Sequence, residues 1–127
     1  MLGDPISNAA SFRDEARYQG LCAVCGKPGP WDPHHVVAKQ WLKKRGLPQW
    51  DTRNALRLCK IMGGRNNCHA RHENAVRRVK TRELTPASIQ YAFELMGPHG
   101  ADYLRTYYDD GDPDPRIERE LEAKITA

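Results

Sequence analysis

Four cysteines restrict the folds open to this chain more than any other feature of its 127 residues. Cys22 and Cys25 form a C-x2-C pair, and this spacing lets one tight turn present both sulfurs to a tetrahedral zinc ion. Cys59 and Cys68 would complete a four-cysteine site, and the longer loop between them adds little closure entropy. We therefore expect these four side chains to bind a structural Zn²⁺ ion.

Other roles for the cysteines are open at this point. His69 could replace one cysteine in a site of three cysteines and one histidine, or the thiols could simply be buried. Two disulfides are the alternative for a secreted chain, but the N-terminus has neither the basic nor the apolar segment of a signal peptide. The chain also lacks an apolar run of the roughly 20 residues that span a bilayer. We expect a cytoplasmic protein without a membrane partner.

Charge is distributed unevenly along the chain. The first 101 residues carry 16 Lys and Arg against 8 Asp and Glu, whereas residues 102–127 carry 4 against 8. A basic body with an acidic tail suits a polyanionic partner such as nucleic acid, although charge alone is equally consistent with simple solubility.

Apolar periodicity predicts a mixture of short helices and short strands. Helices are expected at 11–18, 38–45, 68–79, 86–96 and about 103–108, and strands at 35–37 and 54–59. Ser11 is the expected N-cap of the first helix, and Gly20 its end. Leu56 and Leu58 are expected inside and Arg57 outside, as in a half-buried strand, with Gly63-Gly64 ending it. The fold class is therefore predicted to be α+β.

Histidines next to the cysteines suggest a second metal centre. His34 and His35 are adjacent, so in an extended segment they point to opposite faces and are expected to have different roles. On a helix, His72 and Glu73 follow His69 by three and four residues, which places each within about 60° of it. Two ligand atoms could thus project from one helix toward a strand that carries His34.

The order C-x2-C, His-His-Val, Asn-Ala-Leu-x-Leu-Cys and Cys-His resembles the HNH endonucleases of the ββα-metal type. The resemblance covers roughly residues 21–79. In that family a hairpin and a helix hold one divalent metal ion, and a zinc ion bound by four cysteines often braces the fold. It implies the following division: an N-terminal helical extension at 1–20, an HNH nuclease core at 21–82, C-terminal helices packing on that core at 83–108, and an acidic linker with a terminal helix or flexible tail at 109–127.

The resemblance also implies roles for individual residues. His35 matches the general base, and a neutral imidazole can accept a proton from water at cellular pH. Asn54 matches the middle motif residue, which orients the base or ties the loop together. His34 and His69 match ligands of a catalytic Mg²⁺, Mn²⁺ or other divalent ion. Some members supply a further ligand four residues beyond the helix histidine, where this chain has Glu73; between His72 and Glu73, we favour His72.

The activity that the resemblance implies is metal-dependent hydrolysis of DNA phosphodiester bonds, by nicking or double-strand cleavage. Seven basic residues are expected to neutralise backbone phosphates: Lys39, Lys43, Lys44, Arg45, Arg71, Arg77 and Arg78. The rival interpretation is a non-catalytic zinc module that binds nucleic acid or a protein, and a second rival is the same core acting on RNA or branched DNA. Membership of a phage packaging or restriction assembly and the oligomeric state stay open.

Overall fold

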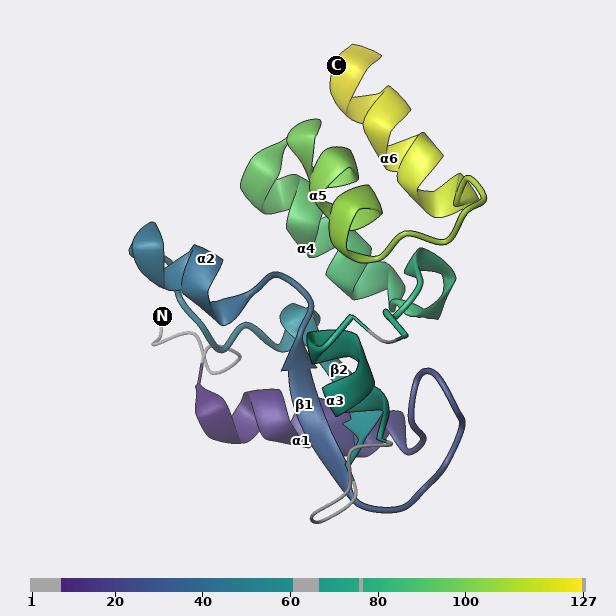
Figure 1. The fold of residues 1–127 in the computed structure, drawn as a ribbon. Helices are drawn as coiled ribbons and strands as arrows, with labels where there is room; N and C mark the ends of the chain where they lie inside the picture. The colour runs from purple at the N-terminus through teal and green to yellow at the C-terminus, as the bar shows by residue number, and fades with distance from the viewer. Residues whose placement is uncertain (1–7, 61–66, 76, 127) are drawn as a thin grey trace.

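A small antiparallel sheet, enclosed by helices, forms the middle of the molecule (Figure 1). The computed structural model describes residues 8–60, 67–75 and 77–126. Their helices and two-stranded sheet give the α+β class that the sequence predicts. None of the helices in these described ranges combines the length and hydrophobicity that crossing a bilayer requires.

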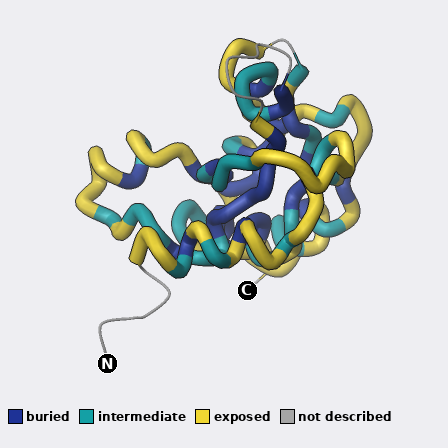
Figure 2. The backbone as a smooth tube through the Cα atoms, turned by 90° about the horizontal axis from the view of Figure 1, so that it is seen from below, coloured by how far each residue is buried: buried dark blue, intermediate teal, exposed yellow. Residues whose placement is uncertain are grey.

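The two strands run along the centre of the fold. β1 (Trp31–His35) pairs with β2 (Ala55–Cys59) in a register that places Trp31 opposite Cys59 and His35 opposite Ala55. Cys59 and His35 therefore lie at opposite ends of this ribbon. All five residues of β2 are buried (Figure 2), because helices cover both of its faces.

The expectation that β2 would be half-buried is wrong, because α1 (Ala9–Gln19) packs across the sheet. Arg57 is only 5% exposed, although its position alternates with those of the inward leucines. Its guanidinium donates to the carbonyls of Arg17 at 3.3 Å and Pro28 at 2.9 Å, and lies 4.9 Å from the ring centroid of Trp31. Hydrogen bonds and a cation–π contact thus let an arginine occupy an interior position.

The N-cap of the first helix lies three residues earlier than expected. The side chain of Asn8 accepts a hydrogen bond from the amide of Ser11 at 2.9 Å, so Asn8 and not Ser11 is the N-cap. Gly20 ends the helix as predicted, with φ of 80°, which glycine adopts without a steric penalty.

The segment after β1 leaves the sheet earlier than predicted. Val36 and Val37 are buried but lie beyond the strand. The amide of Val36 still bonds to the backbone carbonyl of Asn54, but the amide and carbonyl of Val37 both bond to the side chain of Asn54 instead of to its backbone. The chain then forms the short helix α2 (Lys39–Lys44), which projects away from the sheet (Figure 1), and a 3-10 turn at Thr52–Asn54 leads into β2.

The helix after the cysteine loop is half as long as predicted. α3 (Cys68–Glu73) is capped by Asn67, whose side chain accepts from the amide of Ala70. It stops because Ala75 turns to φ of 55° and the amide of Val79 bonds to the side chain of His72 instead of continuing the helix. Gly63-Gly64 lies outside the described residues.

Three C-terminal helices form a layer beside the sheet (Figure 1). They are α4 (Pro86–Met96), α5 (His99–Tyr107) and α6 (Pro115–Thr126), preceded by a 3-10 turn at Thr81–Glu83. α4 begins and ends as the sequence predicts, with Thr85 as N-cap and Gly97 as C-cap. Tyr108, directly after α5, is buried in the same hydrophobic cluster as the side chains of the sheet, so the layer and the sheet share one core.

Candidate functional site

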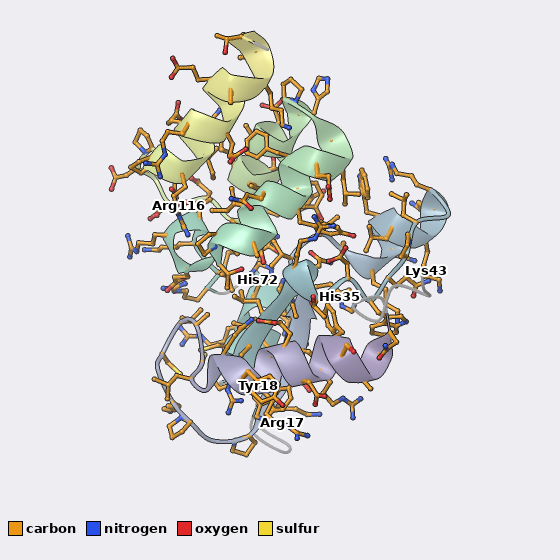
Figure 3. The ribbon with its side chains drawn as sticks, turned by 180° about the vertical axis from the view of Figure 1, so that it is seen from behind. Arg17, Tyr18, His35, Lys43, His72 and Arg116 are labelled. Carbon is orange, nitrogen blue, oxygen red and sulfur yellow. The ribbon has the colours of Figure 1, made fainter. Side chains whose placement is uncertain are left out.

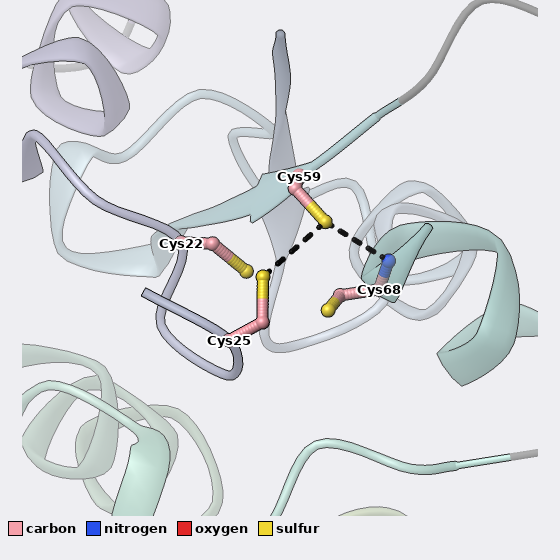
Figure 4. A group of neighbouring side chains, drawn as sticks. All are labelled: Cys22, Cys25, Cys59 and Cys68. Atoms are coloured by element: carbon pink, nitrogen blue, oxygen red, sulfur yellow. Dashed lines mark hydrogen bonds between the residues drawn. The ribbon is translucent and has the colours of Figure 1, made fainter. Parts of the chain in front are cut away.

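The four cysteines lie together at one end of the sheet (Figure 4). Cys22 and Cys25 come from the loop after α1, Cys59 ends β2, and Cys68 begins α3. Their sulfur atoms all lie within 4.8 Å of one another and could hold a metal ion. The Sγ atoms of Cys25 and Cys59 are 3.7 Å apart, and the amide of Cys68 donates to Cys59 Sγ at 3.3 Å.

Burial and hydrogen bonding shift the pKa values of the thiols in different directions. Burial raises the pKa of Cys22, but backbone hydrogen bonds at Cys25, Val24 and Cys59 outweigh it and bring the pKa down to about 7. Burial raises the pKa of Cys25, and burial together with the neighbouring cysteines raises the pKa of Cys68. A cation between the sulfurs would remove the repulsion among thiolates, which is the condition for binding a metal through all four.

Two of the other roles considered for the cysteines, disulfides and a site that includes His69, do not match this geometry. All four are free, and 3.7 Å between Cys25 and Cys59 is far longer than the roughly 2.05 Å of a disulfide. His69, the candidate fourth ligand, belongs to a different group of side chains.

That second group consists of His34, His69 and Glu73. One ligand atom of each lies within 4.8 Å of the others. His69 Nε2 is 3.3 Å from Glu73 Oε1, and His34 Nδ1 is 3.9 Å from the same oxygen. His34 comes from the inner face of β1, where burial, followed by the neighbouring histidines, holds its pKa well below the ordinary value. A neutral imidazole on a rigid strand is a suitable metal ligand.

Glu73, rather than His72, completes this group. His72 Nδ1 accepts a hydrogen bond from the amide of Val79 at 2.9 Å, so the lone pair of that nitrogen is already engaged. Burial lowers the pKa of His72, although Glu73 raises it, and a neutral ring then carries its proton on Nε2. His72 is therefore placed as a hydrogen-bond donor, and the predicted choice of His72 as a ligand is not supported by this geometry.

His35 has the arrangement of a base. Its Nε2 is 2.8 Å from the carbonyl oxygen of Gln49, which can only accept, so Nε2 carries the proton and Nδ1 the lone pair. The ring stacks on Phe12 at 4.3 Å and lies 5.3 Å from Trp50. Burial lowers the pKa of His35, although the contact with Gln49 opposes the shift; Lys39 lowers it further. The imidazole is thus neutral and fixed in orientation.

Asn54 ties the loop that follows His35. Its side-chain oxygen accepts from the amide of Val37 at 2.7 Å, and its side-chain nitrogen donates to the carbonyl of Val37 at 2.9 Å. Asn54 is fully buried. Of the two roles expected for Asn54, these contacts correspond to holding the loop and not to touching a substrate.

A basic cleft of about 1020 Å³ opens above the histidines. His34, His35, His69, His72 and Glu73 all contribute to its lining. Of the seven predicted basic residues, five line it: Lys39, Lys43, Lys44, Arg45 and Arg78. Within the described part of the chain, Glu73 is the sole acidic residue in the lining. Figure 3 shows Lys43 on α2 and His35 at the end of β1.

Two of the predicted basic residues are placed differently. Arg77 forms a double hydrogen bond with Glu83, at 2.6 and 2.9 Å, and so braces the turn after α3. Arg71 is on α3 but is not among the lining residues.

Several residues of the site were not predicted. Arg13 lines the cleft from α1, and no sequence pattern indicates which exposed residue of that helix faces it. Asp32 contacts His69, with 3.0 Å between Oδ2 and Nδ1. Here the sequence held a signal, because Asp32 precedes His34 by two residues and so shares its face of the strand.

Comparisons with protein-family models, curated proteins and solved structures find no match to this chain.

Proposed function

We propose that this protein is a metal-dependent HNH endonuclease that hydrolyses phosphodiester bonds of DNA. The observation that carries the proposal is that His34 Nδ1 and His69 Nε2 lie 3.9 and 3.3 Å from Glu73 Oε1, in a basic cleft that all three residues line together with His35. β1, β2 and α3, which position these atoms, form the ββα-metal core of the proposal. A Zn²⁺ ion bound by the four cysteines braces it.

The donor set suits a catalytic divalent ion. Two imidazoles and one carboxylate favour Mn²⁺ or another transition-metal ion over Mg²⁺, which prefers oxygen ligands. Three protein ligands leave coordination positions for water and phosphate, as in catalytic rather than structural metal sites. When bound, such an ion supplies positive charge that stabilises the phosphate and the leaving 3′ oxygen in the transition state.

His35 acts as the general base. Its Nδ1 takes a proton from a water molecule while the water oxygen attacks phosphorus and the bond from phosphorus to the 3′ oxygen breaks. The hydrogen bond to Gln49 keeps the proton of the resting imidazole on Nε2, so that Nδ1 is available for this transfer. His72, with its proton on Nε2, donates a hydrogen bond to a phosphate oxygen in the same cleft.

DNA is the proposed substrate because basic side chains from three segments of the chain line the cleft. These are Arg13 of α1, Lys39 and Lys43 of α2, and Arg78 from the segment after α3. Charges distributed in this way contact consecutive phosphates of one backbone and carry little sequence information.

The experiment is cleavage of supercoiled plasmid in the presence of Mn²⁺ or Mg²⁺, with and without chelator. His35→Ala is expected to lower the cleavage rate by about 10²- to 10⁴-fold, because the water loses its base, while fold and zinc content are retained. His99→Ala is the matched control, since the side chain of His99 is exposed on α5. Equal rates for wild type and folded His35→Ala would refute the role of His35. DNA binding without cleavage in any metal would support the non-catalytic module instead.

A further inference from the structure

The hydroxyl of Tyr108 lies between two polar groups of the segment that carries the histidine pair. It is 2.9 Å from His34 Nε2 and donates to the carbonyl oxygen of Val36. Tyr108 is 2% exposed and follows α5, 74 positions after His34. Tyr108 thus connects the C-terminal helical layer to His34, one of the candidate metal ligands.

The direction of the Tyr108 hydrogen bonds determines which ring nitrogen of His34 carries the proton. A carbonyl oxygen can only accept, so the single hydroxyl proton of Tyr108 is directed to Val36. The hydroxyl oxygen can then only accept from His34, whose proton must be on Nε2. The lone pair of His34 is therefore on Nδ1, the nitrogen that faces Glu73 at 3.9 Å.

Packing alone does not require the hydroxyl. The ring of Tyr108 stacks on His72, with 5.2 Å between centroids and 14° between planes, and a phenylalanine would make the same contact. Burying a hydroxyl without hydrogen bonds is unfavourable, so this one is tolerated because of its contacts with His34 and Val36.

We propose that Tyr108 is a positioning residue that fixes the tautomer of His34 and so aims Nδ1 at the ion in the cleft. Its role for the ion rests on the proposed function. Asp32 does the same for His69: the carboxylate accepts from Nδ1 at 3.0 Å, which leaves the lone pair on Nε2, 3.3 Å from Glu73 Oε1. The two histidines thus present different nitrogens to the ion, Nδ1 of His34 and Nε2 of His69, because Tyr108 and Asp32 bind the proton on the other nitrogen of each ring.

The first measurement is the tautomer itself, by long-range ¹H–¹⁵N NMR on the metal-free full chain. Wild type is expected to show His34 protonated on Nε2. Tyr108→Phe removes the acceptor, so His34 is expected to populate the Nδ1-protonated form, in which Nδ1 donates to Glu73. Tyr103→Phe is the matched control, because the Tyr103 hydroxyl accepts from the amide of Ala38 at 2.8 Å and does not contact His34.

The second measurement is Mn²⁺ affinity at the cleft, by electron paramagnetic resonance. Tyr108→Phe is expected to bind Mn²⁺ about 10- to 100-fold more weakly and Tyr103→Phe as tightly as wild type. An unchanged His34 tautomer in Tyr108→Phe would overturn the proposal, as would an altered tautomer with unchanged affinity. Neither readout measures cleavage, so an inactive wild type would count against the endonuclease proposal alone.

Asp32→Asn provides an independent variant should Tyr108→Phe not fold. The side chain of Asp32 is 27% exposed, and its amide replacement can donate as well as accept. His69 is then expected to populate the Nε2-protonated tautomer and Mn²⁺ binding to weaken. If His69 stays protonated on Nδ1 in Asp32→Asn while Mn²⁺ binding weakens, then Asp32 does not determine which nitrogen of His69 is free to bind the ion.

Discussion

The two clusters of metal-ligating side chains share one helix but differ in their surroundings. Cys59 ends β2 and His34 lies on β1, whereas Cys68 and His69 are consecutive residues of α3, so α3 contributes to both clusters. The cysteine cluster has four possible protein ligands, three of them buried, whereas the histidine cluster has three and lines a basic cleft.

The difference in ligand number is the reason for proposing a structural role for the cysteine cluster and a catalytic role for the histidine cluster. Four protein ligands complete the tetrahedral shell of Zn²⁺ and leave no place for a substrate, while three leave positions open. The cysteines also join segments distant in sequence, from Cys22 to Cys68, that converge at one end of the sheet. The histidines line the same cleft as the described basic residues of α1 and α2, and a polyanion is the proposed ligand of that cleft.

Because the two clusters share α3, the histidine cluster is expected to depend on the cysteine cluster, but not the reverse. Cys68 is the first residue of α3, the helix that carries His69 and Glu73, so loss of the cysteine site is expected to displace both side chains. Glu73 is exposed and belongs to the last turn of α3, so its loss leaves the cysteine site intact.

The largest effect is expected from Cys59→Ser. Structural Zn²⁺ in small domains contributes an apparent 10–16 kcal/mol, about as much as the whole stability of a domain of this size. The variant is expected to lose bound zinc and its near-UV circular dichroism. Ala23→Ser is the control, because it adds a hydroxyl in the same cysteine loop without removing a ligand. A Cys59→Ser protein that melts like wild type would refute the structural role of the cluster.

A smaller and more selective effect is expected from Glu73→Ala. Removing one of three ligands should weaken Mn²⁺ binding in the cleft by at least about 10-fold, while zinc content and melting temperature are retained.

His72→Asn should leave Mn²⁺ affinity unchanged and slow cleavage. The amide oxygen of the asparagine can still accept from the amide of Val79, but no Nε2 donor remains.

Glu122→Ala, which removes an exposed carboxylate of α6, is the control for charge. Equal Mn²⁺ affinities of Glu73→Ala and wild type, or loss of Mn²⁺ binding in His72→Asn, would reverse the assignment of Glu73 as the ligand.

Much of the cysteine cluster could be predicted from the sequence because its chemistry is local. C-x2-C spacing fixes how Cys22 and Cys25 are presented, and cysteine is the only standard residue that offers a thiolate. The α+β class and α4 were also predictable, since Thr85, Pro86 and Gly97 mark the helix ends through backbone chemistry.

The histidine cluster was harder to predict because its details depend on tertiary contacts. The choice between His72 and Glu73 depends on the amide of Val79, which reaches His72 only because α3 ends early. Tyr108 contacts His34 across 74 positions, and no periodicity relates the two. Arg57 was expected outside, since alternation in β2 carries no information about the helix that covers its outer face.

The smallest effect, and the most direct test of the cleft as the DNA surface, is the salt dependence of binding. Lys43 lines the cleft from α2, whereas Arg17 lies on α1 away from it and pairs with Asp14 at 3.9 Å (Figure 3). Each phosphate contact contributes about 0.9 to the slope of log affinity against log salt concentration. Lys43→Ala is therefore expected to reduce the slope by roughly 0.9, measured by fluorescence anisotropy, and Arg17→Ala to leave it unchanged. Because both variants remove one positive charge, an equal reduction would mean that overall charge, and not the cleft, attracts the DNA.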